Sequence, residues 1–239
     1  MIKLLVIEVQ HYSQSMFRIR TNRPNTFRFT AGEFVMISCR ENSVKRAYSI
    51  TSGPGDDYLE FLSIKVPDGE LTQELVRYEP GDVLYINERT SGTLTLANIE
   101  LGGSLWLLAT GTGVAPFISI LKDGYTYEQF NKINLMWSVR RSNDLNVYKE
   151  MLRTLPINFI PIVTQDKTWK GLNKRITEMI SAGMVLTPTD LDPNKNKVMI
   201  CGSMEFNNDI KSILTSWGWQ EGNRKTAGTF VQEKAFVSQ

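Results

Sequence analysis

The first hundred residues carry short runs in which apolar and polar positions alternate, and turn residues separate these runs. Such alternation is typical of half-buried strands, and closely spaced strands with glycine- and proline-rich turns favour a small antiparallel barrel. One stretch differs, because residues 71–76 have helical spacing behind Asp68-Gly69. Besides a first strand near the N-terminus, the pattern predicts strands at residues 27–29, 34–37, 59–66 and 83–86.

Beyond about residue 100 the pattern changes to buried-strand runs that alternate with helical segments. The strands are predicted at residues 105–109, 133–139, 159–163 and 197–201, and the helices at 117–121, 146–155, 174–182 and 207–217. This alternation predicts a parallel sheet wrapped by helices, and ligands of such sheets bind at the carboxyl ends of the strands. We therefore expect a β-barrel domain over residues 1–99 and an α/β domain over residues 100–239.

Composition narrows the function classes. A formal net charge of +2 argues against a general nucleic-acid binder, which carries a strong basic excess. The two cysteines, Cys39 and Cys201, form no Cys-x-x-Cys pair, so a thiolate-bound metal or iron–sulfur cluster is not expected. The N-terminal apolar run is too short to span a membrane, and no targeting signal accompanies it. A cytoplasmic location without membrane contact is the prediction.

A glycine-containing turn, Thr110-Gly111-Thr112-Gly113-Val114-Ala115-Pro116, follows a predicted strand and opens a predicted helix. Glycines allow a phosphate to approach the backbone, and a helix N-terminus attracts negative charge. Pro116 replaces the third glycine of the dinucleotide pattern, but proline suits the first turn of a helix. The turn indicates a phosphate loop, and a tight strand-to-helix turn without a ligand remains the alternative.

Two further strand ends carry candidate chemistry. The second strand of the α/β half ends in Arg140-Arg141, where dinucleotide folds often place an acid for the ribose hydroxyls. A cation there suits a phosphorylated ribose and favours NADP, although a solvated charged turn gives the same pattern. Cys201-Gly202-Ser203 closes a later strand, where the cysteine either meets a ligand ring or is a small buried hydrophobe.

The order of these segments resembles the ferredoxin–NADP reductase family, most closely its bacterial type. The resemblance rests on Arg46-Ala47-Tyr48-Ser49, the turn from Gly111 to Phe117, Cys201-Gly202-Ser203 and a carboxylate near the C-terminus. It implies an antiparallel FAD-binding β-barrel followed by a Rossmann-like, parallel-sheet NADP-binding domain. The C-terminal tail is then expected to return to the flavin.

The resemblance also implies roles for individual residues on the flavin side. Arg46 would bind the FAD pyrophosphate, Tyr48 would stack on the isoalloxazine ring, and Ser49 would lie near flavin N5. Ala235 would lie against the flavin and Phe236 on the FAD adenine. The remaining FAD-binding residues implied by the family are Ala47, Ser63, Val66, Glu70, Leu71, Thr72 and Thr112.

On the nucleotide side, the family implies that Gly111, Gly113, Pro116, Arg140, Thr164, Gln165, Arg175, Cys201, Gly202 and Ser203 bind NADP. Gln165 departs from the family, which has an arginine there, so one charge-assisted contact to phosphate is missing. Lys167, Lys170 or Lys174 are candidates to compensate. Ser49, Cys201 and Glu233 are implied to position donor and acceptor for hydride transfer.

The implied activity is FAD-dependent electron transfer between NADP(H) and ferredoxin or flavodoxin by a monomer. Lys45-Arg46, Lys65 and Arg224-Lys225 are candidates for a basic docking face, or for a solvated charged surface. Two alternatives stay open. The chain could be the reductase component of an oxygenase, although it has too few cysteines for the iron–sulfur domain such reductases often carry. It could also be a flavin- or nucleotide-binding module without turnover, which the retention of Ser49, Cys201 and Glu233 opposes.

Overall fold

The computed structural model describes residues 1–187 and 191–235, and the chain packs into two compact units. The first comprises Met1–Gly92 together with Ala115–Asp123, and the second comprises Thr93–Val114 and Gly124–Ala235. The functional limits 1–99 and 100–239 stay predictions, as does the return of the tail to the flavin. Phe236 lies outside the described residues.

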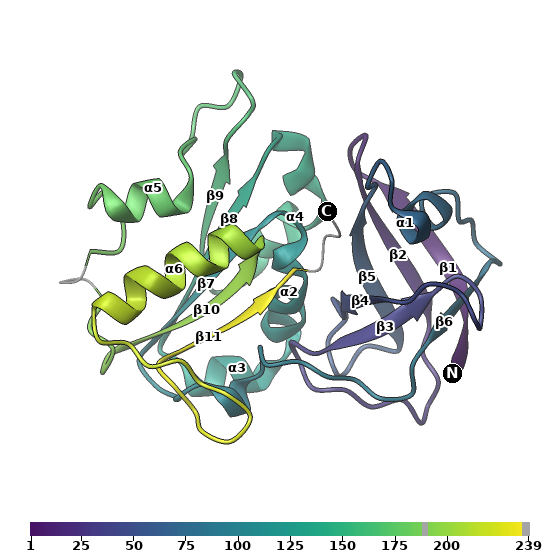
Figure 1. Ribbon diagram of the computed structural model, residues 1–239, viewed down its shortest axis with the longest axis horizontal. Helices are drawn as coiled ribbons and strands as arrows, with labels where there is room; N and C mark the ends of the chain where they lie inside the picture. The colour runs from purple at the N-terminus through teal and green to yellow at the C-terminus, as the bar shows by residue number, and fades with distance from the viewer. Residues whose placement is uncertain (188–190, 236–239) are drawn as a thin grey trace. The chain divides into compact units, whose positions relative to one another are not determined.

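The first unit contains a six-stranded antiparallel sheet in the order β4-β3-β6-β1-β2-β5 (Figure 1). An antiparallel bridge between Ile50 and Phe61 joins the chain beyond β4 to β5, which nearly closes the sheet. The antiparallel barrel predicted from the sequence is therefore confirmed. Its strands are β1 (Ile2–His11), β2 (Met16–Asn22), β3 (Phe34–Ser38), β4 (Arg46–Ser49), β5 (Tyr58–Ile64) and β6 (Val83–Ile86).

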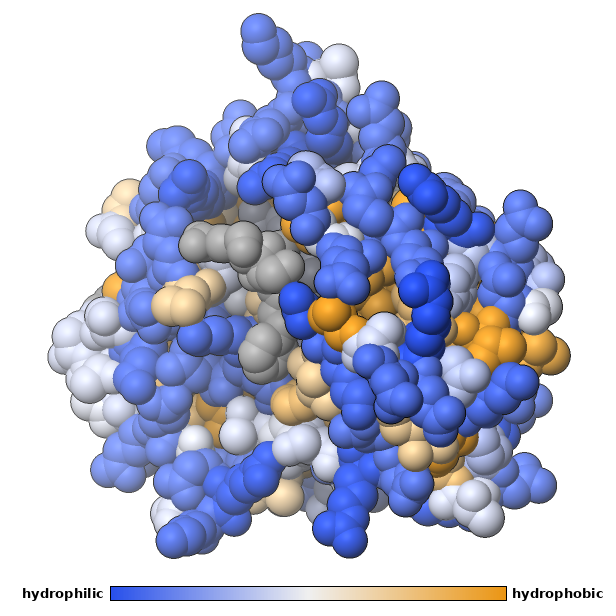
Figure 2. Space-filling view, turned by 45° about the vertical axis from the view of Figure 1, so that its right-hand side comes forward, coloured by the Kyte–Doolittle hydropathy of each residue, from blue (hydrophilic) through white to orange (hydrophobic). Residues whose placement is uncertain are grey.

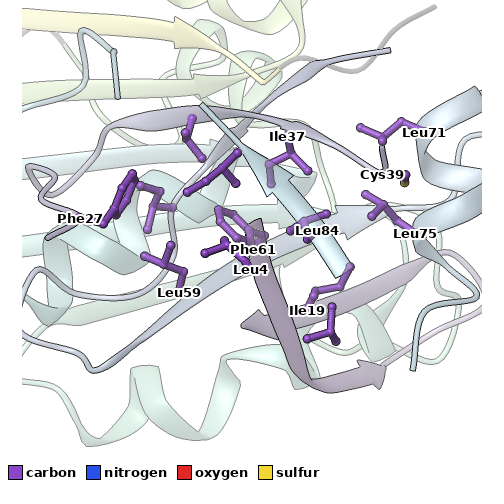
Figure 3. Packing of buried hydrophobic residues seen from close by; sticks show 14 of the residues in the cluster. Leu4, Ile19, Phe27, Ile37, Cys39, Leu59, Phe61, Leu71, Leu75 and Leu84 are labelled. Atoms are coloured by element: carbon purple, nitrogen blue, oxygen red, sulfur yellow. The ribbon is translucent and has the colours of Figure 1, made fainter. Parts of the chain in front are cut away.

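The barrel interior is filled by the inward-facing residues of its strands. Along β1, Leu4 and Val6 are buried, whereas Leu5 and Ile7 between and beyond them are about half exposed. A short helix, α1 (Glu70–Leu75), adds Leu71 and Leu75 to the same core (Figure 3). The helical spacing predicted for this stretch is confirmed, and the two leucines show its physical cause, since residues four apart share one helix face.

The strand predicted at residues 27–29 is wrong. Phe27 and Phe29 are buried and Arg28 is exposed, as the alternation predicts, but these residues pair with no strand. The Phe27 amide instead donates to the Pro24 carbonyl in a turn. Alternation reports which side chains face the core, whereas a strand also needs a neighbouring backbone to bond with.

The second unit is built on a five-stranded parallel sheet in the order β11-β10-β7-β8-β9 (Figure 1). The chain therefore starts in the middle, at β7, runs to one edge and returns to the other side through β10. That arrangement is the doubly wound, Rossmann-like pattern, with its switch point between β7 and β10. The strands are β7 (Ser104–Thr110), β8 (Lys132–Val139), β9 (Asn158–Val163), β10 (Asn196–Gly202) and β11 (Phe230–Lys234).

Helices α5 (Ile176–Ser181) and α6 (Met204–Ser216) cover one face of this sheet and share a buried cluster with it. The helix predicted at residues 146–155 is divided into a 3-10 segment, η3 (Ser142–Val147), and α4 (Lys149–Thr154). A further helix, α3 (Gly124–Gln129), was not predicted, because its sequence Gly-Tyr-Thr-Tyr-Glu-Gln has no apolar stripe.

Figure 2 shows polar residues over most of one face, with smaller apolar groups between them. Within the described ranges, no helix has the length and apolar character that a membrane crossing requires.

Candidate active site

The five parallel strands end at one edge of the second unit's sheet, and most predicted nucleotide-side residues lie there. In the register of the sheet, Cys201 on β10 is paired with Ala109 on β7 and with Glu233 on β11. Val139 pairs with Val163, so the residues that follow β8 and β9 also start side by side. Tertiary structure thus brings together segments that are far apart in the sequence.

The glycine turn forms a 3-10 segment, η2 (Gly111–Val114), between β7 and a helix, α2 (Ala115–Lys122). Gly113 packs directly on the end of β10, since a Cβ there would lie 2.1 Å from the Cys201 carbonyl oxygen. Gly111 has φ +53° and open space where a Cβ would project. The indole of the buried Trp137 donates to the Gly111 carbonyl at 2.8 Å. The turn is therefore anchored on one side and open at Gly111.

Cys201 and Glu233 lie next to each other on adjacent strands. Cys201 is buried, and burial, reinforced by the nearby Glu233 charge, raises the pKa of its thiol well above the ordinary value. The thiol is therefore held in its protonated form. It is a small polarisable group and not a thiolate nucleophile.

The Glu233 carboxylate is held by a residue to which sequence reasoning assigned no role. Thr93 donates to Glu233 Oε2 through its amide at 2.7 Å and its hydroxyl at 3.2 Å. Burial raises the pKa of Glu233, although the Thr93 bonds oppose that shift. Around it, Asn207 donates to the Glu233 carbonyl and the Ala235 amide donates to the Gly202 carbonyl. No local pattern in the sequence pointed to Thr93.

The segments after β8 and β9 form a polar corner at the same sheet edge. The Thr164 amide donates to the Val139 carbonyl at 3.0 Å, and the Gln165 amide donates to the Arg140 carbonyl at 2.9 Å. Asp166 then accepts hydrogen bonds from Ser142 and Thr168, which lower the pKa of its carboxyl well below the usual range.

The two arginines predicted to bind NADP differ in their surroundings. Arg140 is exposed and forms no ion pair with the part of the chain that the structure describes. Arg175 precedes α5 as its N-cap residue, and its guanidinium lies 3.9 Å from the carboxylate of Glu205 in the first turn of α6. Both partners of that pair are largely exposed, so the pair is weak and its guanidinium stays accessible. Ser203 is the N-cap of α6 and accepts a bond from the Phe206 amide.

The predicted flavin-side residues of the first unit lie on β4, β5 and α1 and in the loop between β5 and α1. The Tyr48 hydroxyl and the Ser63 hydroxyl are 3.0 Å apart, and burial raises the pKa of Tyr48 to about 12. Arg46 is exposed, and its guanidinium bonds only the neighbouring Lys45 carbonyl among the residues described. Ala47 and Ser49 are half-buried on the same strand. A neutral aromatic ring and an available guanidinium are therefore presented by one strand.

The loop before α1 is stiffened by its own side chains. Thr72 accepts from the Val66 amide at 3.1 Å and donates to the Gly69 carbonyl at 3.1 Å. Glu70 is exposed in the first turn, whereas the Leu71 side chain is buried in the barrel core. Any contact of Leu71 with a ligand would therefore use its backbone.

Comparison with known proteins tests what this arrangement is. Residues 1–80 match the model of an FAD-binding domain, and residues 107–212 match the oxidoreductase NAD-binding domain. The ferredoxin–NADP reductase A of Sorangium cellulosum is 36% identical to the chain, over 98% of the chain and 90% of that protein. The chain belongs to the ferredoxin–NADP reductase family.

Other similar proteins support the same family assignment. The flavodoxin/ferredoxin–NADP reductase of Rhodobacter capsulatus is 35% identical, over 98% of the chain and 93% of that protein. A crystal structure of a ferredoxin NADP+ reductase from Neisseria gonorrhoeae with bound FAD and NADP has a TM-score of 0.88 at 27% identity, covering 98% of both chains. A ferredoxin reductase of carbazole 1,9a-dioxygenase, at 17% identity and a TM-score of 0.76, shares the fold.

Proposed function

We propose that this reductase transfers electrons between NADP(H) and ferredoxin or flavodoxin, using FAD as its redox cofactor. The observation that carries the proposal is the sheet edge at which Cys201 and Glu233 adjoin the open Gly111 turn. The names of the relatives support both carriers, and the two matched domain models together with those names support both cofactors. These relatives are reductases, which favours an enzyme over a binding module without turnover.

The residues present fit the FAD that the family implies. Arg46 offers an accessible fork of donors for a pyrophosphate, and Tyr48 offers a neutral ring for stacking. Ser49 ends the same strand, at the position proposed to face flavin N5. Ala47, Ser63, Val66, Glu70, Leu71 and Thr72 are proposed to line the groove, with Thr112, Ala235 and Phe236 supplied by the rest of the chain.

The fit to NADP rests on the turn and the polar corner. Gly111 leaves open space above the backbone, Gly113 allows η2 to pack closely on β10, and Gly202 allows β10 to pack closely on Thr110 and Phe206. Pro116 is the second residue of α2, where its missing amide proton costs no helical bond. Arg140, Thr164, Gln165 and Arg175 are proposed to meet the adenosine phosphate, and Cys201, Gly202 and Ser203 the nicotinamide half.

When bound, FAD would supply the chemistry of accepting one hydride, and thus two electrons, and of releasing these electrons singly to a protein carrier. The chain's own residues are proposed to place the hydride donor against its acceptor. The protonated Cys201 thiol provides a close-packed surface beside the nicotinamide without competing as a nucleophile. Glu233, anchored by Thr93, limits the space next to it and holds its proton more readily than an exposed glutamate would. Ser49, Cys201 and Glu233 are therefore proposed to act together by orienting donor and acceptor.

The proposal is tested on the purified protein with FAD. We expect a yellow protein that oxidises NADPH and passes the electrons to a ferredoxin or flavodoxin, followed through a cytochrome c that reports the reduced carrier. A protein that stays colourless after incubation with FAD, or that reduces neither carrier, would refute it. A requirement for an oxygenase component instead of these carriers would favour the alternative of an oxygenase reductase.

Replacing Arg175 with alanine should weaken the use of NADPH more than that of NADH. A hydrogen bond to a charged group contributes about 1.5–3 kcal/mol, so we expect kcat/KM for NADPH to fall at least tenfold. The value for NADH, which lacks the 2′-phosphate, should change little. Steady-state reduction of ferricyanide measures both, with Arg153→Ala in α4 as the control. An unchanged ratio between the two nucleotides would remove Arg175 from the phosphate site.

Five basic residues are candidates for the surface that docks the carrier. Lys45, Arg46, Lys65, Arg224 and Lys225 are proposed to attract an acidic carrier, and all five are exposed. A monomeric state and a cytoplasmic location stay predictions.

A further inference from the structure

Helix α2 packs within the first unit, although the segments on both sides of it in the sequence belong to the second. The nucleotide turn η2 ends at Val114 and α2 begins at Ala115, with no residue between them. The turn is therefore covalently continuous with a helix that the barrel unit holds. How tightly the barrel holds α2 then matters for the turn.

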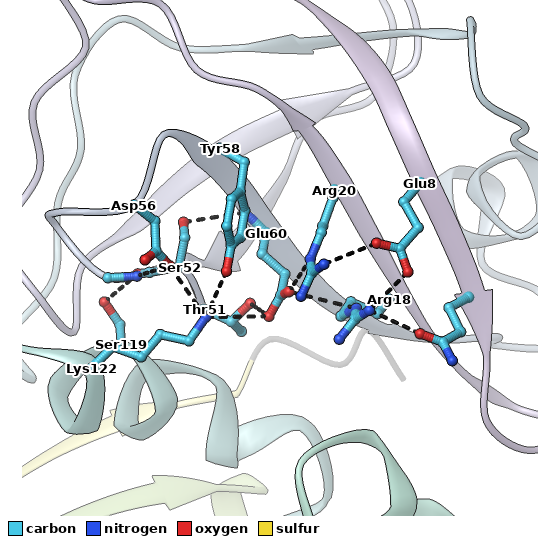
Figure 4. A network of polar contacts seen from close by, with 12 residues as sticks. Glu8, Arg18, Arg20, Thr51, Ser52, Asp56, Tyr58, Glu60, Ser119 and Lys122 are labelled. Carbon is cyan, nitrogen blue, oxygen red and sulfur yellow. Dashed lines mark hydrogen bonds and ion pairs between the residues drawn. The ribbon is translucent and has the colours of Figure 1, made fainter. Parts of the chain in front are cut away.

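The contacts of α2 are directed at the segment that follows Ser49. The buried Ser119 hydroxyl donates to the Ser52 carbonyl at 2.8 Å. Lys122 Nζ lies 3.3 Å from Asp56 Oδ2 and 3.3 Å from the Tyr58 hydroxyl (Figure 4). A Cβ on Gly53 would lie 2.9 Å from the Lys122 Cβ, so the helix rests on bare backbone there.

The carboxylate of Glu60 lies next to these contacts, and its side chain has no exposed surface. Glu60 accepts from Arg20 Nε at 2.7 Å and from the Thr51 hydroxyl at 2.9 Å. Its Oε1 is also 3.9 Å from Lys122 Nζ. A buried ionic group is a poor source of net stability compared with apolar packing, and its best-attested use is to specify one arrangement. Such a group fits a role in setting where Lys122, and with it α2, must lie.

We infer that Ser52, Gly53, Glu60, Ser119 and Lys122 form a latch that positions the nucleotide turn for hydride transfer. The latch ties η2, through α2, to the segment that starts one residue after Ser49. Because Ser49 is proposed to lie at the flavin and η2 under NADP, a loosened latch would relax the placement of donor against acceptor. Hydride transfer is sensitive to such placement, whereas neither cofactor touches Lys122 in this scheme. The inference rests on the proposed function, and Ser119 and Lys122 are positioning residues.

The test uses the full chain loaded with FAD and separates two half-reactions by stopped flow. Flavin reduction by NADPH requires correct placement of the nucleotide, whereas reoxidation of the dithionite-reduced protein by ferricyanide does not. We expect Lys122→Met to reduce the rate of the first reaction about tenfold or more, and to leave the second reaction and FAD retention unchanged. Lys122→Arg, which keeps the cation, should restore part of the rate.

Two further variants make the result specific. Gly53→Ala inserts one methyl group between the segment and α2 and should also slow reduction by NADPH while leaving reoxidation unchanged. Lys211→Met removes a helix lysine that pairs with Glu221 at 2.6 Å in the second unit, and it should match the wild type.

Equal rates of reduction in Lys122→Met, Gly53→Ala and the wild type would overturn the latch. Parallel losses in both half-reactions and in FAD retention would also overturn it, because they indicate general destabilisation. A wild type that NADPH does not reduce would instead refute the proposed function.

Discussion

Replacing Glu233 with alanine is expected to reduce the rate of flavin reduction by NADPH about a hundredfold, since a misplacement of about 1 Å at a reacting centre can cost that much. The variant removes a carboxylate that adjoins Cys201 and leaves the Thr93 amide without its acceptor, whereas the Thr93 hydroxyl keeps its bond to the Gln232 carbonyl at 3.0 Å. The space proposed for the nicotinamide should then become larger and admit more water. Stopped-flow absorbance of the bound flavin measures the rate, and FAD content shows whether the site is still formed.

The matched control is Glu221→Ala, which removes a carboxylate of the same unit that bonds Gln232 and Lys211. Its rate should stay near that of the wild type. Glu233→Gln separates shape from charge, because the amide can keep the bonds from Thr93. Burial raises the pKa of Glu233, so the protonated form persists to higher pH than usual, and the amide resembles it best below that raised pKa. A Glu233→Ala enzyme that reduces flavin within twofold of the wild-type rate would exclude Glu233 from the placement of the nucleotide.

Replacing Glu60 with glutamine is expected to lower the free energy of unfolding by about 3–5 kcal/mol, the usual cost of removing one partner from a buried ionic group. The side chains of Arg18, Arg20 and Lys122 surround this carboxylate and are themselves only 11%, 29% and 18% exposed. Glutamine keeps the volume but presents an amide where a cation now meets a carboxylate oxygen. The buried Arg18 Nε already lacks a hydrogen-bond partner, so little local compensation is available.

Urea denaturation followed by circular dichroism measures this loss. The control is Glu74→Gln, which breaks an ion pair of 3.1 Å with Arg40 on the surface of the same unit. Exposed pairs contribute about 0–1 kcal/mol, so this variant should stay close to the wild type. If Glu60→Gln and Glu74→Gln lower the free energy of unfolding by the same amount, the buried cations do not depend on the charge of Glu60, and the prediction is wrong.

Much of the architecture could be predicted from local patterns. Alternation in the first hundred residues predicts a barrel, and the change of pattern near residue 100 predicts the parallel sheet. Both predictions hold because side-chain periodicity follows directly from backbone geometry. The strand predicted at residues 27–29 is wrong because strand formation also requires a partner strand. Burial of Phe27 and Phe29 is encoded locally, but pairing depends on a second backbone that the local pattern does not contain.

The candidate site divides in the same way. The glycine turn, Arg140-Arg141 and the strand Arg46–Ser49 are short contiguous segments whose residue types suggest their chemistry. Thr93 could not be found in this way, because its role depends on Glu233, which lies 140 positions further along the chain. The latch is also invisible locally, since Glu60 and Lys122 read as ordinary charged positions until the fold buries them together.

Local sequence patterns were enough to predict the two halves of this reductase, the order of its candidate ligand-binding segments and its family. Tertiary structure decided which of those segments meet: the register that sets Cys201 beside Glu233, the Thr93 anchor, and the assignment of α2 to the barrel unit. The physical reason is that secondary structure follows from nearest neighbours, whereas burial of a charge and the register between strands depend on residues distant in sequence. The polar contacts that position the site belong to this second class.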